Sequence, residues 1–221
     1  MTFLRARSTE QREIRRQAIL DTAVAMLDEM PVAEVSLNEL SRRVGLAKSN
    51  VLRYFESREA VLFELLEHAM AGWLAQLPDE LAAGVEPRGS ARERGDQVAA
   101  VLSASLARQT VLCDLINAQT NVLEHNVSVE VVVRHKRSAI AGIATTSDLV
   151  RRHVPELGDG ARAVSMTTLI LAGALSSYCR PSASALAAYE ADPIVLELRL
   201  DLRATLESAV ATLIAGTLAR S

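Results

Sequence analysis

Residues 36–59, SLNELSRRVGLAKSNVLRYFESRE, constrain the fold of this chain more than any other stretch. Ser36 and Glu39 have the spacing of a capping box, in which each side chain bonds a free backbone N–H at the start of a helix. Apolar residues then recur at helical spacing up to Gly45, and glycine often ends a helix because it tolerates a positive φ. The stretch therefore predicts a helix, a tight turn at Gly45 and a second short helix over about residues 47–55.

The second of these predicted helices has two chemically different sides. With a rotation of about 100° per residue, Ala47 and Phe55 fall within about 40° of Val51, whereas Ser49 and Arg53 fall about 160° away. We therefore expect Ala47, Val51 and Phe55 to pack inward, and we expect Ser49 and Arg53 to face outward.

The outward side carries residue types that can bond to DNA. Ser49, Asn50 and Arg53 can reach base edges, with arginine suited to guanine and asparagine to adenine. Lys48 and Tyr54 lie at the edges of this side, where they are suited to phosphates. The pattern predicts a helix that is placed in a DNA groove, although a plain helical core with solvated Arg and Ser would produce the same spacing.

The positive charge of the chain is concentrated around this motif. The whole chain has a net charge of −3, but residues 42–58 contain five Lys or Arg and one Glu. Residues 1–16 contain five Arg and two Glu. A mildly acidic protein with local positive charge is suited to contact with phosphates at one place.

The composition predicts an all-α protein with a sizeable core. Hydrophobic residues make up 49% of the 221 residues and aromatic residues only 3%, and the abundant Ala and Leu favour helix. We expect two domains, one at residues 1–56 and a larger helical one at 57–221. Periodicity and breaker residues predict a loop at 78–90 and helices over about 10–29, 57–77, 90–107, 110–124, 128–153, 160–178, 183–190 and 193–218.

The first 60 residues resemble the tetracycline-repressor family of bacterial transcriptional regulators. The matching segments are Ala18-Ile19-Leu20, Ser36-Leu37-x-x-Leu40, Gly45-Leu46-Ala47-Lys48 and Tyr54-Phe55-x-Ser57-Arg58-Glu59-Ala60-Val61-Leu62. The resemblance implies an N-terminal helix-turn-helix domain joined by a helix to a ligand-binding and dimerisation domain. It also implies DNA contacts at Ser36, Lys48, Ser49, Asn50, Arg53, Tyr54 and Arg58.

Three positions depart from the family pattern. Leu52 stands where the family commonly has a tyrosine that contacts phosphate, which puts one backbone contact in doubt. Met30-Pro31 replaces a glycine after the first helix, and Ser41 replaces an alanine. None of these changes removes the motif.

Dimerisation is expected on separate physical grounds. A single helix-turn-helix makes few base contacts, and dimers that read two half-sites are the usual solution. The charge-free stretch at 163–179 and the last predicted helix, with apolar residues from Leu198 to Leu218 at helical spacing, are the candidate interface. Both could instead be core helices of a monomer.

An effector pocket is expected between the helix at 57–77 and the helices at 96–153. Such pockets are mostly apolar with a few polar groups. The candidate lining residues are Trp73, Cys113, Asn117, Asn121 and His125. Each has an alternative role. Trp73 and Cys113 are of types common in protein cores, and Asn117, Asn121 and His125 could face water or end a helix.

The sequence favours a ligand-responsive repressor that binds a palindromic operator as a homodimer and is released by a small molecule. An enzyme is disfavoured, since the chain has no nucleophile elbow, phosphate loop, HExxH or CxxC. We expect no cofactor, no metal, no membrane association and a cytoplasmic location, because the polar first residues do not form a signal peptide. The alternative function is a helical protein-binding adaptor with a degenerate motif.

Overall fold

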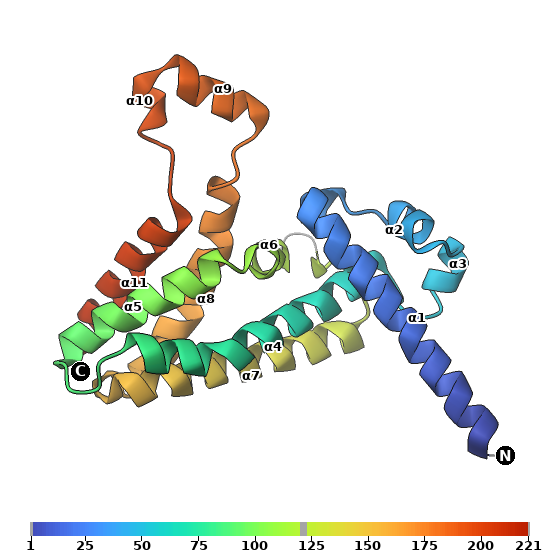
Figure 1. The fold of residues 1–221 in the computed structure, drawn as a ribbon, viewed down its shortest axis with the longest axis horizontal. Coiled ribbons are helices and arrows are strands. Elements are labelled where there is room, and N and C mark those ends of the chain that lie inside the picture. Colours follow the sequence, from blue (N-terminus) through green and yellow to red (C-terminus); the bar gives the residue numbers. More distant parts are fainter. Residues whose placement is uncertain (1, 120–122, 221) are drawn as a thin grey trace. The chain divides into compact units, whose positions relative to one another are not determined.

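The computed structural model describes residues 2–119 and 123–220, and its regular structure is helical throughout these ranges (Figure 1). The α-helices are α1 (Thr2–Glu29), α2 (Leu37–Val44), α3 (Lys48–Val51), α4 (Arg58–Gly84), α5 (Ala91–Ala107), α6 (Thr110–Ala118), α7 (Val129–His153), α8 (Gly160–Tyr178), α9 (Ala183–Ala191), α10 (Pro193–Leu196) and α11 (Leu202–Leu218). Two 3-10 turns are η1 (Val32–Glu34) and η3 (Pro155–Leu157). The all-α prediction is confirmed.

The chain divides into two compact units. The first combines Met1–Glu67 with Ala118–His135, and the second combines His68–Asn117 with Lys136–Ser221. Both α4 and α7 therefore contribute residues to each unit. The domain division expected after residue 56 stays a prediction.

The first unit has its own apolar core. Ile19, Ala23 and Met26 form a fully buried stripe along α1, as their helical spacing predicts. The start of α7 belongs to this unit because the His135 ring stacks on Phe63 of α4, with their ring centroids 4.2 Å apart. Within this unit α2 packs against α1 and α3 packs against α2, so the short helices are anchored to the long one.

Helices α5, α8 and α11 form the packed centre of the second unit, beside which the later parts of α4 and α7 run (Figure 1). Helices α5 and α11 approach closely at Gly95, where an added Cβ would lie 2.7 Å from the Cγ2 atom of Ile214. Helices α9 and α10 form a hairpin that projects from the ends of α8 and α11 (Figure 1), and neither helix contains a buried residue.

Several local predictions about helix bounds are wrong, beginning with α1, which starts at Thr2 and not near Glu10. Helix α4 continues through Pro78 to Gly84, where the prolines and glycines at 78–90 predicted a loop. Proline removes one backbone hydrogen bond from a helix, but Leu77 and Leu81 on either side of Pro78 are fully buried. Burial of these side chains, at about 1.5–3 kcal/mol each, offsets that loss.

The last predicted helix is also interrupted. Its first part is the separate helix α10, and α11 begins only at Leu202, where the Asp201 side chain accepts a hydrogen bond from the Ala204 N–H at 2.7 Å. Leu198 therefore lies outside any helix, contrary to the expected apolar stripe. Helix α6 runs to Ala118, and Gln119 after it is π-helical. The predicted continuation to Glu124 crosses residues 120–122, which lie outside the described residues, so this end stays a prediction.

No single helix in the described part of the chain is long and apolar enough to cross a membrane, although α5 and α6 together, which meet at an 88° bend, reach that length and composition.

Candidate nucleic-acid interface

The first helix of the motif is capped and ended as its sequence predicts. The Ser36 hydroxyl accepts a hydrogen bond from the Glu39 N–H at 3.1 Å, and Gly45 adopts a φ of 73° directly after α2. The second bond of the predicted capping box, from the Ser36 N–H to the Glu39 carboxylate, does not form, so this part of the prediction is wrong. The Glu39 carboxylate bonds to two arginines of α2, because their charge attracts it more strongly than the Ser36 N–H does.

These two arginines, Arg42 and Arg43, are largely neutralised within the unit. Glu39 accepts from Arg42 at 2.8 and 2.5 Å and from Arg43 at 2.8 Å, and Arg43 also reaches Glu29 at 2.7 Å. The hydrogen bonds from Arg42 and Arg43 lower the pKa of Glu39 to about 2. Much of the positive charge on α2 is therefore used to stabilise the motif.

Helix α3 ends at Val51, so the helix predicted over about residues 47–55 is too long, but α3 and the turn after it still present the side chains that were expected to face outward. Val51 and Phe55 are buried, whereas Ser49, Asn50 and Arg53 are exposed. Lys48 is exposed as well, and Tyr54 is half-buried.

Ala47 differs from the prediction because it is exposed. It precedes α3 in an extended conformation, with φ −63° and ψ 145°, so the rotation of 100° per residue does not apply to it. The base and phosphate contacts of the other residues stay predictions.

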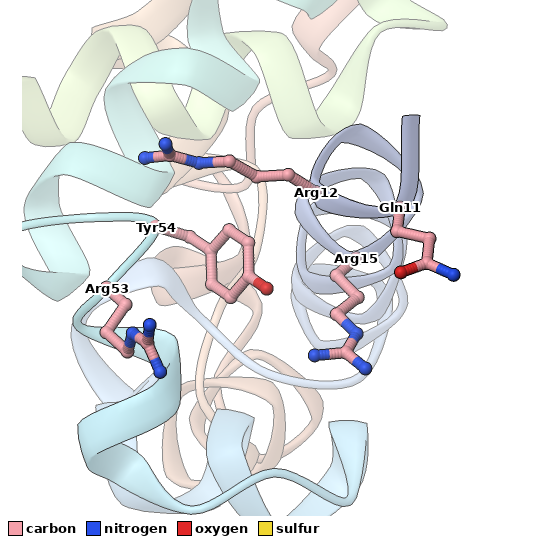
Figure 2. Close-up of a pocket in the computed structure, with 5 residues that line it drawn as sticks. All are labelled: Gln11, Arg12, Arg15, Arg53 and Tyr54. Carbon is pink, nitrogen blue, oxygen red and sulfur yellow. The ribbon is translucent and has the colours of Figure 1, made fainter. Parts of the chain in front are cut away.

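A hollow of about 370 Å³ lies between α1 and the end of the motif and is lined by Gln11, Arg12, Arg15, Arg53 and Tyr54. Figure 2 shows the Tyr54 ring between Arg53 on one side and Gln11 and Arg15 of α1 on the other, with the Arg12 side chain extending past the ring. The sequence prediction did not place Gln11, Arg12 and Arg15 in the site. The excess of arginine near the N-terminus was the signal, but the sequence did not show which of these arginines meet Arg53.

Arg16, one residue further along α1, ties this helix to the motif. Its guanidinium donates to both carboxylate oxygens of Glu64 on α4, with an Nε–Oε1 distance of 2.9 Å. Its Nη1 donates to the Tyr54 carbonyl at 3.1 Å, and its Cζ lies 4.4 Å from the Phe55 ring centroid. These bonds fix the position of residues 54 and 55 relative to α1.

Arg58, which the family resemblance aligns with a DNA contact, is held by internal partners. Its Nη1 donates to the Val35 carbonyl at 2.8 Å, and its Nε donates to Glu59 at 3.1 Å. Glu59 is buried and holds the Arg58 guanidinium, whose bond to the Val35 carbonyl connects the start of α4 to the segment before α2. A role for Arg58 at DNA stays a prediction.

The residues predicted to line an effector pocket occupy different environments. Trp73 is buried and its Nε1 donates to the Ser105 hydroxyl at 3.0 Å. Cys113 is buried too, and burial raises the pKa of its thiol to about 12. Asn117 is exposed and donates to Ser177 at 2.7 Å, and His125 is exposed. Asn121 lies outside the described residues, and the pocket role of all five stays a prediction.

The second unit contains a hollow that the sequence did not indicate. It has a volume of about 650 Å³ and lies at the base of the α9–α10 hairpin, where the segments after α8 and before α11 meet the start of α6. Its lining includes the apolar Leu186 and Leu200 together with Arg180 and Arg199. Arg180 donates to Asp114 on α6, which also accepts from Ser176 at 2.6 Å.

Two family models match this chain and together cover nearly all of it. The model described as "Bacterial regulatory proteins, tetR family" matches residues 19–65. The model described as "Tetracyclin repressor-like, C-terminal domain" matches residues 67–221.

Curated relatives match over about a quarter of the chain. The HTH-type transcriptional regulator EthR of Mycobacterium tuberculosis is 38% identical over 56 residues, which are 25% of this chain and 26% of EthR. EthR of Mycolicibacterium smegmatis is 38% identical over 53 residues, 24% of each chain. The chain thus matches about a quarter of the length of these relatives.

Solved structures match over most of the chain at low identity. The transcriptional regulator FadR from Bacillus subtilis, solved in complex with stearoyl-CoA, aligns with a TM-score of 0.54 and 14% identity over 90% of this chain and 98% of its own. The fatty acid degradation regulator FadR from Bacillus halodurans aligns with a TM-score of 0.53 and 15% identity over 90% and 94%. At this identity the likeness concerns the fold alone.

Proposed function

Because the chain belongs to the tetR family of bacterial regulatory proteins, we propose that it is a ligand-responsive repressor. In this proposal it binds a palindromic operator as a homodimer and is released by a small-molecule effector. Membership of the family supports a transcriptional regulator that binds DNA through the first unit. The repression, the dimer and the effector are our proposal for this chain.

The observation that carries the proposal is the outward side of α3. Ser49 and Asn50 are exposed on a helix whose opposite side, at Val51, is fully buried. A buried anchor fixes the direction in which the polar side chains point, and such a helix can place them against base edges in the major groove. Ser49 and Asn50 are therefore the proposed base-reading residues.

The dimer is supported by an apolar face on α8 that the monomer leaves exposed. Met166, Ile170 and Tyr178 are 42%, 56% and 71% exposed, and they follow each other at helical spacing. The predicted stripe on the last helix can supply this face only in part, since Leu206 is fully buried in the chain's own core whereas Leu202 and Leu213 are half-buried.

The side of α11 that carries small residues is suited to close packing against a second copy of the chain. Ala204, Ser208 and Thr212 line an open hollow along α11, and small side chains allow helices to approach closely. Two helices from each subunit would then form a four-helix interface with two-fold symmetry. In such a dimer the two α3 helices are held at a fixed separation that matches two half-sites.

An effector acts in this proposal by binding one arrangement of the dimer better than another. Only such a difference in affinity can shift the α3 helices away from the half-site spacing. The hollow at the base of the α9–α10 hairpin supports an effector site in the second unit, because its volume of about 650 Å³ falls within the range of small-molecule pockets, roughly 300–1,000 Å³.

Selection of bound duplexes from a random DNA pool tests the function. The wild-type protein should enrich one palindromic sequence. Asn50→Ala should weaken binding to that sequence by about 1–3 kcal/mol and relax the preference at one position in each half-site. Ser184→Ala, which removes an exposed polar group from α9, should leave the selected sequence unchanged.

The adaptor alternative makes the opposite prediction. A protein-binding adaptor has no reason to prefer one duplex, so its selected pool should stay random. An unchanged preference in Asn50→Ala would instead remove Asn50 from the base-reading role while leaving the regulator intact.

A further inference from the structure

We propose that the hollow between α1 and the segment after α3 binds phosphodiester groups of the DNA backbone, and that Arg53 acts there with Arg12 and Arg15 instead of reading a base. This inference rests on the proposed DNA-binding function and assigns a second, sequence-independent contact surface to it. The hollow is lined by these three arginines, Gln11 and Tyr54 (Figure 2).

The charge of this hollow is unbalanced. Arg12, Arg15 and Arg53 are all exposed, and the residues that line the hollow with them include no carboxylate. Three like charges at one place repel each other, and an anion between them would relieve that repulsion. The hollow therefore favours a bound anion.

Other arginines of the same unit behave differently. Within the described residues, Arg16 pairs with Glu64, Arg58 with Glu59, and Arg42 and Arg43 with Glu39, whereas no described ion pair involves the three arginines of the hollow. The unit thus separates arginines that stabilise the fold from arginines that are left available for a ligand.

Guanidinium groups and a phenol suit phosphate oxygens. The guanidinium presents several N–H donors in a planar fork that matches a phosphate, and the Tyr54 hydroxyl can donate as well. A volume of about 370 Å³ equals about twelve water molecules at roughly 30 Å³ each. This space accommodates phosphodiester oxygens together with bridging water.

The hollow is held in shape by Arg16, which we assign as a positioning residue. Arg16 fixes α1 to α4 through Glu64 and holds the Tyr54 carbonyl at 3.1 Å. The two walls of the hollow, α1 and the end of the motif, are thereby kept at a fixed separation before DNA arrives. A preformed site loses less entropy when it binds its ligand.

This geometry assigns different roles to the residues of α3 and to Arg53 after it. Ser49 and Asn50 near its start read bases, whereas Arg53, two residues after its end at Val51, lines the hollow with the arginines of α1 and contacts the DNA backbone. Loss of Arg53 should then weaken every duplex equally. An arginine that reads a guanine would instead lose affinity only for the operator.

The test measures operator and scrambled-duplex dissociation constants over a range of NaCl concentrations, for the wild type, Arg12→Gln, Arg15→Gln and Arg53→Gln. Each substitution should reduce the slope of log K against log salt by about 0.9 and weaken both duplexes by the same factor. Arg92→Gln, which removes an exposed charge at the start of α5, is the matched control and should leave the slope unchanged. Circular dichroism should give the wild-type melting temperature for all four variants.

Three outcomes would overturn the inference, and each is distinct from failure of the proposed function. An unchanged slope in all three variants would show that no phosphate binds there. A loss in Arg53→Gln that is confined to the operator would make Arg53 a base reader. Replacing chloride by inorganic phosphate at matched ionic strength should weaken both duplexes in the wild type, because phosphate competes for the same guanidinium groups, and should do so less in Arg15→Gln; an equal effect in both proteins would show that the hollow binds no phosphate. A wild type that prefers no duplex would instead remove the proposed function.

Discussion

At the scale of single residues, Gly45 determines whether the motif can form. Its φ of 73° lies in the left-handed region, where a Cβ costs about 1–2 kcal/mol. The sequence predicted this turn from glycine alone, because the need for a positive φ is local and does not depend on distant parts of the chain. The environment of Trp73 was less predictable, since its partner Ser105 lies 32 residues away.

Substitution of Gly45 by alanine should destabilise the protein through backbone strain alone. An added Cβ there would meet nothing within 4 Å, so we expect the free energy of unfolding to fall by about 1–2 kcal/mol. Gly72, inside α4, also has nothing within 4 Å, and Gly72→Ala should stabilise the helix by about 0.5–1 kcal/mol. Urea denaturation of both variants checks this, and a loss of equal size in both would contradict the account.

At the scale of elements, the capped starts of α4 and α5 were predictable from sequence, whereas the starts of α1 and α11 and several helix ends were not. Ser90 with Glu93 forms the predicted capping box at α5, and Ser57 caps α4 through the Ala60 N–H at 3.1 Å. Such caps involve neighbours three residues apart. The passage of α4 through Pro78 depends on burial against other helices, which local spacing does not report.

Replacement of Pro78 by alanine should therefore stabilise α4. Alanine restores one backbone donor and is favoured over proline in a helix interior by up to about 3 kcal/mol. We expect the free energy of unfolding to rise by roughly 1–3 kcal/mol, measured by thermal or urea denaturation. A decrease would mean that the proline ring itself supplies essential packing.

The ion pairs of α2 make the first unit sensitive to acid. The bonds from Arg42 and Arg43 lower the pKa of Glu39 from 4.5 to about 2, so the folded state favours the ionised carboxylate. The resulting stabilisation is fully present above pH 4.5 and is lost as the pH falls through about 2.

Glu39→Gln should remove this part of the pH dependence. The difference in stability between wild type and variant should shrink between pH 5 and pH 2, as followed by circular dichroism in urea at each pH. Glu80→Gln, which breaks an ion pair with Arg108 in the second unit, serves as the comparison. A wild-type curve parallel to that of Glu39→Gln over this range would contradict the assignment.

At the scale of the whole molecule, the sequence predicted the fold class and the motif but missed the hollow at α1. The outward side of α3 followed from a rotation of 100° per residue. The meeting of Arg12 and Arg15 with Arg53 depends on how α1 packs across the motif, with about 40 residues between them in the chain. Long-range packing of this kind leaves no local pattern in the sequence.

The proposed dimer should dissociate when charge enters the exposed face of α8. Ile170 is 56% exposed there, and Ile140 on α7 is 55% exposed. We expect Ile170→Glu to sediment as a monomer at micromolar concentration and to lose operator affinity, because a charge buried in an interface is costly. Ile140→Glu should sediment as the wild type does, and a wild-type monomer would contradict the proposed interface.

The central claim is that the first unit recognises a particular DNA sequence. The most direct test is the ratio of the dissociation constants for a scrambled duplex and for the duplex selected from a random pool, both at physiological salt. A sequence-specific regulator should show a ratio of at least about 1,000, and Asn50→Ala should reduce it. A ratio near one for the wild-type protein would contradict the account.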